Sequence, residues 1–151
     1  MLKTLIAALV GALALSGIAF AASSSETYKL SSKLTAGAEV PKPTGVPASA
    51  AGRFTGTTVE PKTGKVRLTW KLTFSHLSGK ATAAHIHLGR KGKPGGVLVA
   101  LCGPCRSGQT GKALIARSVE RNLEAGKTYV NVHTTKNPAG EIRGQIKVTE
   151  G

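Results

Sequence analysis

Apolar and polar residues alternate without interruption from residue 66 to residue 74, and this is the clearest pattern in the chain. The apolar set is Val66, Leu68, Trp70, Leu72 and Phe74, and the residues between them are Arg67, Thr69, Lys71 and Thr73. Successive side chains of a strand point to opposite faces of a sheet. The pattern therefore predicts a half-buried antiparallel strand with one apolar and one solvated face.

Shorter stretches of the same kind predict further strands, separated by turn residues. They cover residues 28–34, 53–59, 84–89, 97–101, 129–134 and 141–148. Val119 to Ala125 favours one or two helical turns, with Ser118 as N-cap and Gly126 as the C-terminal stop. With about seven or eight short strands, the chain is predicted to be all-β, an antiparallel β-sandwich with one short helical turn.

The N-terminal residues have the composition of a secretory signal. Lys3 precedes an apolar stretch from Leu5 to Phe20, and Ala19-Phe20-Ala21 is typical of a cleavage site. We expect a signal peptide over residues 1–21, a flexible spacer over 22–27 and one domain over 28–149. Such a protein is secreted or periplasmic, and the apolar stretch is too short to favour a membrane span.

Charge adds an expectation about partners. The chain has 21 Lys and Arg against seven acidic residues, a formal net charge of +14. This excess either keeps an exported protein soluble or serves to bind an envelope polyanion, such as an acidic polysaccharide. Aromatic residues make up 4% of the chain, too few for a run of base-stacking platforms, so no specific nucleic acid is expected. Every acidic residue is Glu, which excludes an EF-hand and a Ser-His-Asp triad.

Histidines at alternating positions of two predicted strands suggest a polar site. His85 and His87 share one strand face, as do Asn131 and His133. If the two strands lie close together, the three imidazoles suit copper or zinc, with His76 or Glu141 as a further donor. The alternative is a structural polar network in which the histidines join Asn131, Glu141 and Arg143 to fix strand register.

Three segments together resemble the CHRD domain, a module named after chordin and also found singly in secreted bacterial proteins. They are Leu34 to Val40 followed by Pro41, Ala84 to Gly89 with its two histidines, and Gly126 to Gln145. The resemblance spans residues 28–148 and implies an extracytoplasmic β-sandwich without enzymatic activity, immunoglobulin-like or superoxide-dismutase-like. Its partner would be an envelope polyanion or an extracellular protein.

A fainter similarity links His85-Ile86-His87, followed by Gly89, to the copper-binding segment of copper/zinc superoxide dismutases. A dismutase of that type also needs a bridging histidine and an aspartate. This chain has no Asp and four histidines, so the similarity concerns fold, and metal-dependent redox activity is only a secondary hypothesis.

Two further motifs lie between the histidine segments. Cys102-Gly103-Pro104-Cys105 has the residues of a thioredoxin site, but the Gly-rich sequence after it is a poor helix former. A disulfide across the turn is therefore favoured over redox catalysis or metal binding. In the loop of residues 89–96, Arg90, Lys91 and Lys93 are either anion-binding residues or the solvated tip of a hairpin.

We interpret the chain as a binding or structural module of the cell envelope. Two alternatives are a copper- or zinc-binding protein that uses the histidine cluster and a polyanion binder that uses its basic surface. Two experiments distinguish these alternatives. Replacing the histidines should abolish metal binding, whereas added salt should weaken polyanion binding.

Overall fold

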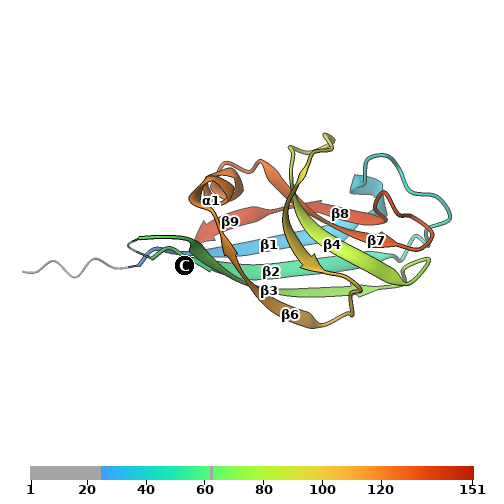
Figure 1. Cartoon of the computed structure of the whole chain (residues 1–151). Helices are drawn as coiled ribbons and strands as arrows, with labels where there is room; N and C mark the ends of the chain where they lie inside the picture. The colour runs from blue at the N-terminus through green and yellow to red at the C-terminus, as the bar shows by residue number, and fades with distance from the viewer. Residues whose placement is uncertain (1–24, 62) are drawn as a thin grey trace, which may run out of the picture.

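The computed structural model of the chain describes residues 25–61 and 63–151, so the predicted signal peptide lies outside the described residues. Nine strands form one antiparallel sheet (Figure 1). They are β1 (Thr27–Thr35), β2 (Ala51–Val59), β3 (Val66–Ser75), β4 (Ala81–Leu88), β5 (Val97–Cys102), β6 (Gln109–Ile115), β7 (Thr128–Thr134), β8 (Ile142–Gln145) and β9 (Lys147–Glu150). A short 3-10 turn, η1 (Ala36–Ala38), follows β1, and one helix, α1 (Arg117–Glu124), lies between β6 and β7.

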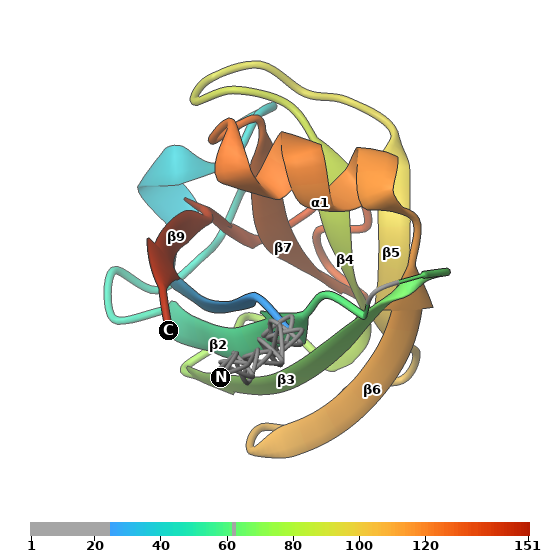
Figure 2. The same cartoon turned by 90° about the vertical axis from the view of Figure 1, so that its left-hand side faces the viewer.

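The sheet nearly closes on itself and gives the molecule two layers. The strand order is β5-β4-β7-β8-β1-β2-β3-β6, and β9 pairs with β1 beside β8. Seen along the strands, β1, β2, β3 and β6 form one wall and β4, β5 and β7 the other, while α1 lies across one end (Figure 2). The all-β prediction is confirmed.

The core lies between the two walls and contains the apolar side of each strand pattern. It includes Leu30, Leu34, Phe54, Val66, Leu68, Leu72, Ile86, Val130, Val132 and Ile142. As the alternation in β3 predicts, Val66, Leu68 and Leu72 are fully buried while Arg67 and Lys71 are exposed. Side chains of the opposite parity therefore face outward and are free to form sites.

Three elements differ from the sequence expectation. Strand β6 was not predicted, because Gly111 interrupts its alternation and the nearby cysteine motif gives no strand signal. The single strand predicted over residues 141–148 forms two strands, β8 and β9. They are separated at Ile146, whose backbone N–H donates to the carbonyl of Thr128. Helix α1 begins at Arg117, because the backbone N–H groups of Val119 and Glu120 already donate to the carbonyl of Ala116, the N-cap, and Ser118 therefore lies inside the helix.

Trp70 requires a glycine on the neighbouring strand. It pairs with Gly111 of β6, and a Cβ at that position would overlap the indole ring. Replacing Gly111 with Ala is therefore expected to lower the free energy of unfolding by about 2 kcal/mol, because overpacking forces the ring aside. Urea unfolding measures the loss. The matched control is Thr110→Ala at the exposed neighbour, and equal midpoints for the two variants would contradict the packing argument.

Candidate metal centre

The structure brings together the three histidines of the predicted metal set. His85 and His87 lie on the outer face of β4, and His133 lies on the same face of β7, which pairs directly with β4. One ring nitrogen from each of the three lies within 4.8 Å of those of the other two. Alternation puts Ile86, between the first two, in the core. Strands β4 and β7 are therefore neighbours, a point that the sequence left open.

Backbone carbonyls fix the tautomers of two of these rings. Nδ1 of His87 lies 2.9 Å from the carbonyl oxygen of Gly95, and Nδ1 of His133 lies 2.9 Å from that of Pro138. A carbonyl oxygen only accepts hydrogen bonds, so each Nδ1 carries the proton. Each ring therefore presents the lone pair of its Nε2 to the cluster. Protein ligands of metal ions are held in this way, with the second ring nitrogen donating to a carbonyl or a carboxylate.

The third ring faces one of these lone pairs. Nδ1 of His85 lies 3.1 Å from Nε2 of His133 and donates a hydrogen bond to it. Two nitrogens bound to one ion at about 2.0–2.1 Å lie at most about 4.2 Å apart. The pair is already inside this limit, and small movements of the His85 and His133 rings bring in the third nitrogen, which lies within 4.8 Å. To bind an ion, His85 takes the tautomer with its proton on Nε2, which frees the lone pair of Nδ1. Nε2 of His87 is buried and has no hydrogen-bond partner among the described residues.

Burial sets the protonation of the cluster. The pKa of His85 is lowered by burial and by its two histidine neighbours. The pKa of His87 is lowered by burial and by the charges of His133 and Arg143, while Gly95 and Asn131 oppose the fall. Both rings are therefore neutral at neutral pH, the form in which imidazole binds a metal ion.

A stack of three side chains supports His87 from the outside. Its ring lies parallel to that of Tyr129, with centroids 4.9 Å apart and planes at 6°. On the other face of Tyr129, Cζ of Arg143 lies 3.3 Å from the ring centroid. Arg143 is 2% exposed. The stack leaves His87 little freedom to turn.

The Arg143 side chain also binds backbone carbonyls of the Gly-rich loop, residues 89–96. One terminal nitrogen donates to the carbonyls of Arg90 (3.0 Å) and Lys93 (2.8 Å). The amide of Gln145 donates to the carbonyl of Gly89 at 2.8 Å. These bonds position the carbonyl of Gly95 on His87. The side chains of Arg90, Lys91 and Lys93 are exposed, so anion binding by them stays a prediction.

A buried carboxylate lies beside the cluster and was not singled out in the sequence. Glu39 is 2% exposed, and a Cβ on Gly140 would overlap its carboxylate and lie 3.0 Å from the amide nitrogen of Asn131. Burial raises the pKa of Glu39, while the Val40 N–H, Arg143 and Asn131 oppose the rise. A lone Glu in a stretch of small residues carries no sequence signal of this role.

Glu141 belongs to a separate network that anchors loops. Its carboxylate accepts hydrogen bonds from the N–H and hydroxyl of Ser78, each 2.6 Å, the hydroxyl of Thr134, 2.6 Å, and the amide of Asn137, 3.2 Å. Asn137 also exchanges hydrogen bonds with the backbone of Thr44. The predicted further donor is thus fully engaged by protein groups and is not part of the three-histidine group.

Other predicted residues lie elsewhere. His76 is exposed, bonds to Ser75 and is also outside the three-histidine group. Glu141 and Arg143, predicted to share a network, contact different partners. Cys102 and Cys105 form a disulfide, which supports the pairing favoured from the sequence. Within the described part of the chain, no helix combines the length and apolar character needed to span a membrane.

Comparison with known proteins gives one family. The model of the CHRD domain matches residues 30–146, which cover most of the chain and all of the residues of the histidine cluster. No curated protein and no solved structure matches the chain.

Proposed function

The chain belongs to the CHRD domain family, and from this premise we propose that it is an exported binding module that holds one copper or zinc ion with His85, His87 and His133. Export rests on the signal-like composition of residues 1–21. The proposed role is binding, without enzymatic activity.

One observation carries the metal assignment. Two imidazoles donate Nδ1–H to backbone carbonyls and turn Nε2 inward, and the Nδ1 of a third meets one of these lone pairs at 3.1 Å. Nε2 of His87 is buried and accepts no hydrogen bond from a protein donor among the described residues, so its lone pair is free for an ion.

The donor set favours a borderline ion over a hard one. Three neutral imidazoles suit zinc and copper, whereas calcium and magnesium require oxygen ligands. Three protein ligands leave a further position for water or another small donor. Such a site suits reversible capture of an ion.

Elemental analysis of the mature chain, expressed with its disulfide intact, tests the proposal. After supply of Cu²⁺ or Zn²⁺ at micromolar concentration and desalting, we expect about one ion per chain. The His85→Ala variant is expected to retain none, since two imidazoles bind far more weakly than three. His76→Ala is the matched control, because it removes an exposed histidine outside the cluster, and it should keep the full stoichiometry.

Two results would contradict the proposal. One is the absence of bound ion in the parent protein at micromolar supply. The other is equal loss of metal in the His76 and His85 variants, which would indicate unspecific surface binding. Thermal unfolding of each variant, measured in parallel, shows whether a lost ion reflects a lost fold.

A further inference from the structure

One wall of the molecule carries a regular array of cations. Among the outward residues of β9, β1, β2, β3 and β6, three adjacent cross-strand rows carry the cations, and a fourth row beside them contains Thr27, Val59, Arg67 and Leu114. The three rows are Lys33, Arg53 and Thr73; then Lys147, Ser31, Thr55, Lys71 and Thr110; then Thr149, Lys29, Thr57, Thr69 and Lys112. We call this surface the basic face. Each row contains two Lys or Arg, and all six of these cations are exposed.

The remaining residues of the rows are hydroxyl-bearing. Thr57 and Thr69, on neighbouring strands, share a hydrogen bond at 2.6 Å between their hydroxyls. None of the row residues is acidic, aromatic or apolar. Neighbouring strands lie about 4.8 Å apart, so five strands spread the six cations over a face about 19 Å wide. The basic face is therefore a broad cationic surface rich in hydrogen-bonding groups.

Acidic residues gather elsewhere. The pKa of the Tyr28 phenol is raised by its hydrogen bond to Glu26, by burial, and by the charges of Glu26, Glu124 and Glu120, which places these carboxylates together near α1. Glu60 binds Arg117 at the start of that helix. Glu39 and Glu141 are buried on the opposite wall. Glu150, at the end of β9, pairs with Tyr28 and points to the opposite face from the row residue Thr149. The cations of the basic face therefore have no acidic partner in their rows.

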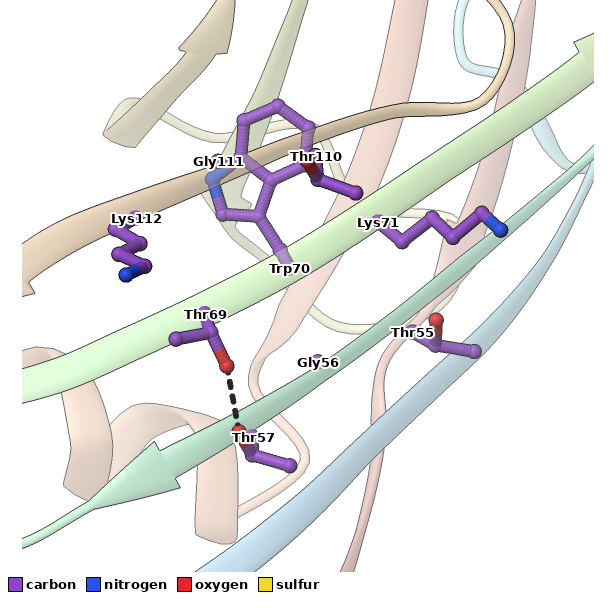
Figure 3. Close-up of a pocket in the computed structure, with 9 residues that line it drawn as sticks. All are labelled: Thr55, Gly56, Thr57, Thr69, Trp70, Lys71, Thr110, Gly111 and Lys112. Atoms are coloured by element: carbon purple, nitrogen blue, oxygen red, sulfur yellow. Dashed lines mark hydrogen bonds between the residues drawn. The ribbon is translucent and has the colours of Figure 1, made fainter.

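The basic face also contains two neighbouring hollows. A shallow hollow of about 420 Å³ lies across β2, β3 and β6 (Figure 3). Its lining includes Trp70 between Gly56 and Gly111, with Thr55, Thr69, Lys71 and Lys112 around them. Figure 3 shows that Lys71 and Lys112 extend from different strands on either side of the Thr57–Thr69 pair. A second hollow, lined in part by Lys33, Arg53 and Lys147, lies next to it across β1.

We propose that the basic face binds an acidic polysaccharide, a chain of sugars that carries carboxylate or sulfate groups. The cations pair with the anionic groups, and the threonine and serine hydroxyls bond to sugar hydroxyls. A nucleic acid fits less well, because Trp70 in the lining of the hollow is only 6% exposed and no aromatic ring in the rows offers a base-stacking platform. An anionic membrane fits less well too, because the three rows have no apolar side chain and the neighbouring row adds only the exposed Leu114 and the half-buried Val59.

Binding assays with two triple variants of equal charge test the location. The first removes cations of the basic face, Lys29→Gln, Lys71→Gln and Lys112→Gln. The second removes those of the Gly-rich loop, Arg90→Gln, Lys91→Gln and Lys93→Gln. The probes are polygalacturonate for carboxylate groups and heparin for sulfate groups, compared with single- and double-stranded oligonucleotides and phosphatidylglycerol vesicles.

We expect the parent protein to bind at least one of the two polysaccharides more tightly than the oligonucleotides or vesicles. The basic-face variant should lose about tenfold or more in affinity at low salt, and its salt dependence should decrease by roughly three counterions. The loop variant should stay within about threefold of the parent, since it acts only through the long-range field.

Three outcomes would overturn the proposal. Equal losses in the two triple variants would show that net charge alone governs binding. Tighter binding to oligonucleotides would assign the face to nucleic acid, and tighter binding to vesicles would assign it to a membrane. The metal cluster lies on the other wall, so His85→Ala serves as a control that should leave polysaccharide affinity unchanged.

Discussion

Replacing Glu141 with Gln is expected to lower the free energy of unfolding by about 3 kcal/mol at neutral pH. The carboxylate is fully buried and accepts four hydrogen bonds, from Ser78, Thr134 and Asn137. Gln has nearly the same shape, but its NH₂ group is a donor and meets donors at one of the two oxygen positions. Urea unfolding of parent and variant at pH 7 measures the difference.

The difference between parent and Glu141→Gln should depend on pH with a definite sign. Burial raises the pKa of Glu141, but the hydrogen bonds from Ser78, Thr134 and Asn137 together outweigh burial and hold it below its ordinary value of 4.5. A carboxyl group with a depressed pKa in the fold stabilises the fold above its unfolded value, and this contribution is lost as pH falls through the folded pKa. The two unfolding free energies should therefore converge in acid.

Glu150→Gln is the matched control for this prediction. Glu150 is exposed at the end of β9, so its replacement should change the unfolding free energy by less than about 0.5 kcal/mol. A Glu141→Gln variant as stable as this control at pH 7 would show that the four hydrogen bonds contribute nothing net. A gap that widened in acid would contradict the depressed pKa.

The Glu141 network also matters for the metal centre. Thr134 and Asn137 close a turn that directly precedes Pro138, whose carbonyl fixes the tautomer of His133. Loosening the network releases that carbonyl. We therefore regard Glu141 as a positioning residue for the cluster rather than a ligand in it.

The sequence predicted which face of its strand each histidine occupies, but it did not predict which strands lie side by side. Alternation alone places His85 and His87 on one face. That β4 lies beside β7 depends on long-range packing, since about 45 residues separate the two segments in the sequence. The strand pattern was strong where one side of a strand is apolar, as in β3, and weak in β6, where Gly111 breaks it.

The supporting shell of the cluster could not be predicted because it is made of backbone carbonyls. The carbonyls of Gly95 and Pro138 belong to loops, and nothing in the identity of a loop residue says where its carbonyl points. Arg143 was predicted to join a polar network with the histidines, Asn131 and Glu141, while its hydrogen-bond partners come from a loop about 50 positions earlier. For the same reason the sequence located basic charge in the Gly-rich loop and missed the rows of the basic face, which exist only through strand register.

Replacing Arg143 with Lys is expected to weaken metal binding by about 10- to 100-fold, the usual cost of disturbing a group that holds a metal ligand. This prediction rests on the proposed metal site. Lys keeps the charge but lacks the planar guanidinium, which both covers the Tyr129 ring and donates to two loop carbonyls. The loop and its Gly95 carbonyl are then held less firmly, and His87 loses part of its orientation.

Titration of Cu²⁺ or Zn²⁺ into parent, Arg143→Lys and Arg90→Gln separates positioning from ligation. Arg90 lies in the same loop and supplies only its backbone carbonyl, so Arg90→Gln should bind like the parent. Arg143→Lys should still bind one ion per chain, but with a raised Kd, whereas His85→Ala binds none. If the Kd of Arg143→Lys equals that of the parent, the loop does not orient His87, and the three imidazoles alone define the site.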